Sequence, residues 1–210
     1  KLPVGTGRKR TGRRILAVAA DCAIGKKYSA LALDKAMREA GLKSTFRATG
    51  QTGIMIAGEG IPIDAVVADF ISGAAELLSP DNVPDHWDII EGQGSIFHPG
   101  YSGVSLGLLH GSQPDGFVVC HDPLRTTVSG WEHYALPSLQ ECIDTHVLLG
   151  RRTNPDIRCV GITVNTSALP AGERSACLRD LARETGLPCC DPIRDGCGVI
   201  VDYIRKEFEV

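Results

Sequence analysis

Short apolar runs and longer amphipathic segments alternate along almost the whole chain. Apolar runs with the length of buried strands lie at residues 15–20, 45–48, 87–91, 117–120 and 160–165, with a short extended segment at 187–190. Segments with helical spacing lie at residues 26–40, 62–78, 101–110, 139–149, 173–185 and 199–207. Strands that alternate with helices are typical of a parallel sheet covered by helices. We therefore predict an α/β fold with a doubly wound, mostly parallel sheet of at least five strands.

Glycine and proline mark the expected ends of several elements. Gly41 and Gly186 follow helical segments, where glycine readily takes the left-handed conformation that closes a helix. Pro62 stands where the second helix is expected to begin, because proline is tolerated in the first turn. A glycine-rich run, residues 50–60, separates this helix from the second strand.

Residues 20–27 connect the first strand to the first helix and have the character of a phosphate-binding loop. Unpartnered N–H groups at a helix start attract anions, Gly25 permits close approach of the backbone, and Lys26 can reach a phosphate. Two positions depart from the pattern G-x-x-x-x-G-K-[ST]: Ala20 replaces the first glycine, and Lys27 replaces the hydroxyl that holds Mg²⁺. The alternative is a helix start with a chance Gly-Lys pair. The predicted cofactor-binding residues are Asp21, Cys22, Ala23, Gly25, Lys26, Lys27 and Tyr28.

The carboxyl ends of parallel strands meet at one edge of a sheet, where ligands bind. Glu91 and His98 follow the third strand and could move protons, so they join Lys26 as predicted catalytic residues. Two other interpretations stay open: Glu91 pairs with a basic residue, or His98 is a hydrogen-bonded structural histidine. Polar residues at the same edge are predicted to bind substrate, the arginines by clamping a carboxylate: Arg47, Gln51, Gln93, Ser95, Arg125 and Asn165.

Composition narrows the class of protein. The formal net charge of −3 gives no electrostatic case for nucleic-acid binding. The basic residues of the segment 1–13 and just after it are interpreted as a solvated lead-in to an α/β domain at 14–210: Lys1, Arg8, Lys9, Arg10, Arg13 and Arg14. No apolar window of membrane-spanning length and no secretory leader are visible. The eight cysteines lack zinc-site spacing, which favours a reducing, cytoplasmic location.

Several motifs together resemble one P-loop family long known only as a domain of unknown function. They are residues 21–28, 47–53, 69–76, 91–99 and 164–167, and they run over nearly the whole chain. The chain departs from the family pattern with Ala19 in place of a glycine. The family includes D-glutamate N-acetyltransferases, whose full-length proteins carry an additional N-terminal Rossmann-like domain. The resemblance implies that this chain is the C-terminal domain, in agreement with its start at Lys1 rather than Met.

The resemblance implies transfer of an acetyl group from acetyl-CoA to D-glutamate or a similar acidic amino acid. In this hypothesis Lys27 supplies the positive charge that Mg²⁺ would otherwise provide to the cofactor phosphates. The loop also distantly resembles dethiobiotin synthetase, so an ATP- and Mg²⁺-dependent ligase or kinase is the alternative, with Asp69 or Glu91 recruiting the metal through water. A nucleotide-binding regulatory module is a third hypothesis. A homo-oligomer without membrane or nucleic-acid partners is also expected.

Overall fold

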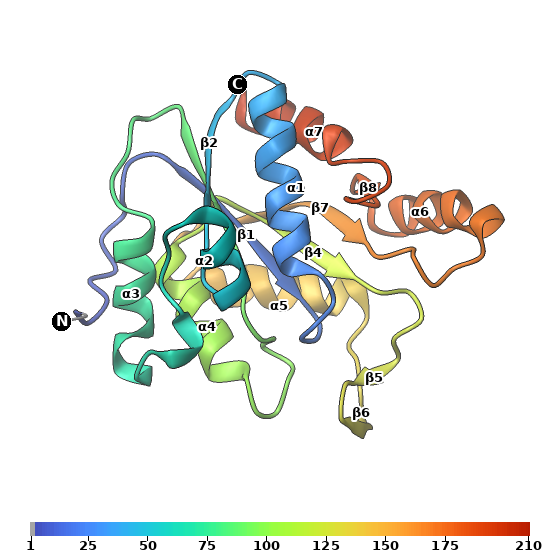
Figure 1. The fold of residues 1–210 in the computed structure, drawn as a ribbon, viewed down its shortest axis with the longest axis horizontal. Coiled ribbons are helices and arrows are strands. Elements are labelled where there is room, and N and C mark those ends of the chain that lie inside the picture. The colour runs from blue at the N-terminus through green and yellow to red at the C-terminus, as the bar shows by residue number, and fades with distance from the viewer. Residues whose placement is uncertain (1–2) are drawn as a thin grey trace.

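The computed structural model describes residues 3–210 and contains a six-stranded parallel sheet (Figure 1). The sheet strands are β1 (Arg13–Ala19), β2 (Lys43–Arg47), β3 (His86–Ile90), β4 (Gly116–His121), β7 (Arg158–Val164) and β8 (Cys189–Cys190). The α-helices are α1 (Lys26–Glu39), α2 (Gln51–Ala57), α3 (Ile71–Leu78), α4 (Ser102–Ser112), α5 (Leu139–Gly150), α6 (Ala171–Thr185) and α7 (Gly198–Phe208). The strand order is β2-β3-β1-β4-β7-β8, so β1 lies inside the sheet.

Each face of the sheet has its own hydrophobic core. Successive residues of a strand point to opposite faces, so Leu16 and Val18 enter one core while Ile15 and Ala17 enter the other. Helices α3, α4 and α5 pack into the first core, and α1 and α7 pack into the second. Strands covered on both sides are expected to be continuously apolar, as β1 is from Ile15 onward and β4 is up to Cys120. The prediction of a doubly wound parallel sheet is confirmed.

The helix predicted from Pro62 begins later than expected. Residues Ile63–Ala65 and Ala68–Phe70 form two 3₁₀ turns, and the α-helix starts at Ile71. Val66 and Val67 adopt extended ψ angles of 134° and 136°, which interrupt helical hydrogen bonding. Ile63 is fully buried, so its packing outweighs a continuous helix. Asp69 therefore lies in a 3₁₀ turn, and the glycine-rich run before it contains the unpredicted helix α2.

The interpretation of the basic N-terminal residues as a solvated segment is wrong for two of them. Arg14 is fully buried and donates to the carbonyl oxygens of Ser79 and Pro80, and Arg10 is 7% exposed and donates to the carbonyl oxygens of Ser79 and Gly111. Carbonyl oxygens that end neighbouring elements accept most of the guanidinium N–H groups, although Arg10 Nη1 has no hydrogen-bond partner among residues 3–210. Desolvation lowers the pKa of each arginine. Lys1 lies outside the described residues.

A small antiparallel hairpin was also absent from the sequence prediction. Strands β5 (Thr127–Val128) and β6 (Trp131–Ala135) form it, and it projects from the carboxyl end of β4 (Figure 1). Its turn contacts the phosphate loop, as described below. Across residues 3–210, no helix combines the length and apolar character required to cross a bilayer.

Candidate cofactor site

The phosphate loop (residues 20–27) turns the chain from β1 into α1. Gly25 precedes the helix with φ 113° and ψ 18°, a conformation that residues with a side chain rarely adopt. A Cβ atom at Gly25 would meet nothing within 4 Å, so backbone conformation rather than space favours glycine there. The first turn of α1 has no acidic residue and no side-chain cap. Its N–H groups are therefore free to bind an anion.

Lys26 is buried at the base of this loop, with 8% of its surface exposed. Its Nζ donates to the Asp21 carbonyl oxygen at 2.9 Å, and within residues 3–210 it forms no ion pair. Burial lowers the pKa of Lys26. A phosphate oxygen would supply the negative charge that this ammonium group lacks.

The Asp21 side chain fixes the shape of the loop. One carboxylate oxygen accepts the Cys22 N–H at 2.7 Å, and the other accepts the Ser129 N–H at 2.9 Å and Arg125 Nη1 at 3.0 Å. Burial alone would raise the pKa of Asp21, but these hydrogen bonds outweigh it and lower the pKa. Arg125 also donates to the Cys22 carbonyl oxygen at 2.8 Å. Asp21 and Arg125 thus fasten the loop to the β5–β6 hairpin.

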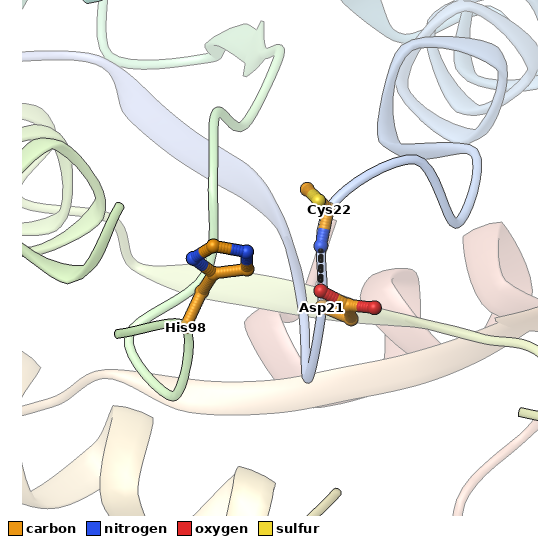
Figure 2. A group of neighbouring side chains, drawn as sticks. All are labelled: Asp21, Cys22 and His98. Carbon is orange, nitrogen blue, oxygen red and sulfur yellow. Dashed lines mark hydrogen bonds between the residues drawn. The ribbon is translucent and has the colours of Figure 1, made fainter. Parts of the chain in front are cut away.

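His98 lies beside the loop with its ring turned toward Asp21 and Cys22 (Figure 2). The ring is fully buried, stacked on Tyr101 at 4.2 Å and edge-on to Trp131 at 4.7 Å between ring centroids. The Gly100 N–H donates to Nδ1 at 3.0 Å, so in the neutral ring Nε2 carries the proton. Nε2 is buried and has no hydrogen-bond partner among residues 3–210.

One ring nitrogen of His98, the Cys22 thiol and an Asp21 oxygen lie within 4.8 Å of one another, a spacing that is compatible with three metal ligands. Their chemistry does not suit a cation. Both Asp21 oxygens already accept hydrogen bonds, one of them from the positively charged Arg125. Burial and the neighbouring Asp21 charge raise the pKa of Cys22, which keeps the thiol protonated.

A cavity of about 800 Å³ opens above the phosphate loop at the carboxyl edge of the sheet. This volume lies within the range of about 300–1,000 Å³ typical of small-molecule sites. Segments after β1, β3, β7 and β8 line it: Cys22–Ser29, Glu91–Gly94, Thr163, Asn165, Ser167, Arg174 and Asp191–Arg194. The position agrees with the general rule for open α/β sheets.

Glu91 directly follows β3 and is 3% exposed. Its Oε2 accepts the N–H groups of Thr49 and Gly50 at 2.9 and 3.0 Å, and its Oε1 accepts no hydrogen bond within residues 3–210. Helix α2 approaches the carboxylate so closely that a Cβ atom at Gly53 would lie 2.2 Å from Oε2. The carboxylate is therefore held in one orientation with one oxygen left for chemistry.

The structure brings Glu91 and Lys26 to the same cavity, as predicted from the strand-end rule. No ion pair joins Glu91 to Lys26 or to Arg47 in the described part of the chain. Arg47 instead pairs with Asp88, its Nε lying 2.8 Å from Oδ1.

The remaining predicted residues divide between the cavity and its surroundings. Gln93 and Asn165 line the cavity, as do the predicted loop residues from Cys22 to Tyr28. Six predicted residues do not: Asp21, Arg47, Gln51, Ser95, His98 and Arg125. Ser95 is buried and donates to the Ala20 carbonyl oxygen at 2.7 Å, so it stabilises the start of the phosphate loop rather than contacting a ligand in the cavity.

Sequence reasoning missed the far wall of the cavity. Arg174 and the segment after β8 form it. The only available signal was the polar segment after the short extended run at residues 187–190, which is a weak sign of a strand end.

Comparisons with known proteins identify the family to which the chain belongs. The family model described as "Domain of unknown function (DUF1611_C) P-loop domain" matches residues 3–201. A D-glutamate N-acetyltransferase from Tritonibacter scottomollicae is 53% identical over 202 residues, which cover 96% of this chain and 61% of that protein. A second, from a Pseudoalteromonas species, is 52% identical over 94% of this chain and 59% of that protein. The chain thus spans about 60% of the length of these relatives.

Solved structures show the same fold. A DUF1611 family protein from Anabaena variabilis has a TM-score of 0.91 at 37% identity, over 98% of this chain and 61% of that one. Cobyrinic acid a,c-diamide synthase from Mycobacterium smegmatis, with bound ADP and magnesium, has a TM-score of 0.57 at 12% identity, over 94% of this chain and 96% of that one. The second likeness concerns the fold alone and confirms that it is P-loop NTPase-like.

Proposed function

Because the chain belongs to the DUF1611 family as its C-terminal P-loop domain, we propose that it serves an N-acetyltransferase that transfers acetyl from acetyl-CoA to D-glutamate or a similar acidic amino acid. The names of two relatives, each more than half identical, support this reaction. One structural observation carries it: a phosphate loop rich in positive charge and a buried, oriented carboxylate face the same cavity. The N-terminal Rossmann-like domain expected from the family is part of the proposal.

The residues present fit a diphosphate without a metal ion. Lys26 has only a carbonyl oxygen as its partner, and Lys27 forms no ion pair within residues 3–210. The loop's one carboxylate, Asp21, is saturated by three donors. Loop N–H groups and the two lysines would hold the cofactor phosphates. When bound, acetyl-CoA would supply an activated acetyl group.

Glu91 is the proton acceptor in this proposal. Glu91 lines the cavity, its Oε1 accepts no hydrogen bond within residues 3–210, and two backbone N–H groups hold Oε2. A carboxylate fixed in this way can take a proton from the substrate ammonium group as the nitrogen becomes a nucleophile. Acidic substrates need cationic partners, but Arg47 and Arg125, the two arginines predicted for this role, are each paired with an aspartate and do not line the cavity.

The test is acetylation of D-glutamate by the full-length protein and by its Glu91→Gln variant, measured as CoA release and product mass. Glutamine keeps an oxygen for the Thr49 and Gly50 N–H groups but accepts no proton. We expect the rate to fall by about 10²–10⁴-fold with CoA binding retained. Glu39→Gln, an exposed change at the end of α1, is the matched control with an unchanged rate. An unchanged rate in Glu91→Gln removes the base role, and a reaction that consumes ATP without acetylating D-glutamate replaces the proposal with the ligase alternative.

A further inference from the structure

The far end of the cavity is built from two loops that one buried carboxylate joins. Asp191, which follows β8, is 6% exposed and accepts hydrogen bonds from the Thr166 hydroxyl and the N–H groups of Ile193 and Arg194. Burial alone would raise the pKa of Asp191, but these bonds outweigh it and lower the pKa. The loops after β7 and β8 therefore form one rigid wall.

This wall presents an apolar surface beside one free amide. Ile193 is 72% exposed and lies next to Pro192 at the cavity. Asn165 Oδ1 accepts the N–H and hydroxyl of Ser167 at 3.2 and 2.7 Å, while Nδ2 has no partner within residues 3–210. An apolar face with a nearby N–H donor suits a flat heteroaromatic ring that has acceptor nitrogens on its edge.

Arg174, in the first turn of α6, places a positive charge at the same end. Its Nε and Nη2 donate to the carbonyl oxygens of Leu169 and Ser167 at 3.1 and 3.2 Å. Its guanidinium has no carboxylate within ion-pair distance in the described chain, whereas neighbouring Arg194 is held by both oxygens of Asp195. Arg174 is thus oriented by carbonyls and leaves Nη1 free for an anion.

We propose that this far end binds the adenosine 3′-phosphate part of coenzyme A, with Arg174 contacting the 3′-phosphate. The inference rests on the proposed function, which places the cofactor diphosphate on the phosphate loop at the other end. The cavity then has two separate cationic regions: Lys26 and Lys27 form one, and Arg174 forms the other. The apolar surface of Pro192 and Ile193 suits the adenine base. ATP and ADP carry a neutral hydroxyl where coenzyme A carries this phosphate, so Arg174 selects for coenzyme A.

The test compares binding of CoA, 3′-dephospho-CoA and ADP with Mg²⁺ to the full-length protein by isothermal titration calorimetry. The unmodified protein should bind CoA roughly 10- to 100-fold more tightly than 3′-dephospho-CoA, the range of one charge-assisted contact. In Arg174→Gln the two affinities should become similar, through weaker binding of CoA alone. Arg179→Gln, an exposed change on the same helix, should keep the preference.

The outcomes separate this inference from the proposed function. If CoA binds with the same preference in Arg174→Gln, the inference is wrong and the acetyltransferase proposal stands. If ADP with Mg²⁺ binds and CoA does not, both are wrong. Circular dichroism of Arg174→Gln, together with its retained affinity for 3′-dephospho-CoA, shows that the variant is folded.

Discussion

At the scale of single residues, the phosphate loop uses its charges for two different purposes. Asp21 and Arg125 neutralise each other and give the loop its shape, since each also bonds loop or hairpin backbone. Among residues 3–210, Lys26 has no such carboxylate, and it is buried against one carbonyl oxygen. A buried ammonium with so little compensation costs stability in the free protein. We interpret that cost as a consequence of its role in ligand binding.

Replacing Lys26 by alanine should therefore weaken ligand binding without unfolding the protein. Loss of a charge-assisted bond to phosphate should reduce CoA affinity by about 1.5–3 kcal/mol, as titration calorimetry would measure. The free energy of unfolding should change little, because a poorly paired buried charge is removed. Lys35→Ala, an exposed change on the same helix, is the control. Unchanged CoA affinity in Lys26→Ala would contradict anion binding at this loop.

At the scale of elements, carboxylates join loops that belong to distant parts of the chain. Asp21 connects the phosphate loop to the β5–β6 hairpin, and Asp191 connects the loops after β7 and β8. Both carboxylates have lowered pKa values because hydrogen bonds outweigh their burial. The walls of the cavity therefore depend on ionised aspartates.

The contribution of ionised Asp21 should be visible in how the free energy of unfolding changes with pH. Its pKa is lower in the folded than in the unfolded chain, so its contribution is complete above the unfolded value, about 4, and is lost as the pH falls through the folded value. Asp21→Asn should lower the free energy of unfolding by about 1–3 kcal/mol at pH 7, measured in urea.

The difference between the wild type and Asp21→Asn should narrow as the pH falls below 4, because the wild-type carboxyl is then protonated too. Asp202→Asn, an exposed change on α7, should match the wild type at every pH. A difference that stays constant down to the acid limit would show that the Asp21 charge contributes nothing.

At the scale of the whole molecule, the sheet and its crossovers determine which charged residues meet at the cavity. These charges bear on whether a metal ion takes part in binding. The cavity at the sheet edge gathers Lys26, Lys27 and Arg174, while the loop carboxylate Asp21 is already used. An ammonium 4 Å from a divalent cation is repelled by about 8 kcal/mol at an effective dielectric constant of 20. Lys27, at the position of the usual metal-binding hydroxyl, thus favours metal-free binding of a diphosphate.

CoA binding and acetyl transfer by the full-length protein should therefore persist in EDTA. Lys27→Thr, which restores the usual hydroxyl, should weaken CoA binding in EDTA because one positive charge is lost. Titration calorimetry with and without Mg²⁺ measures both effects. Loss of binding on chelation and its recovery with Mg²⁺ would favour the ATP-dependent ligase.

The sequence by itself determined the parallel sheet, the phosphate loop and the edge where the site lies. These features depend on local periodicity and on residues close together in the chain, such as Gly25 and Lys26 at a helix start. The positions of Glu91, Gln93 and Asn165 at this edge also follow from the strand-end rule.

Only the tertiary structure decided which polar groups are free to bind a ligand. Arg125 is hydrogen-bonded to Asp21, 104 positions away, and Arg47 to Asp88, 41 positions away, whereas the only partners of Arg174 among the described residues are carbonyl oxygens. The sequence indicates which charges exist, but their partners depend on how crossovers place distant loops. The free energy of each charge depends on those partners and on burial, so availability for binding is a property of the folded chain.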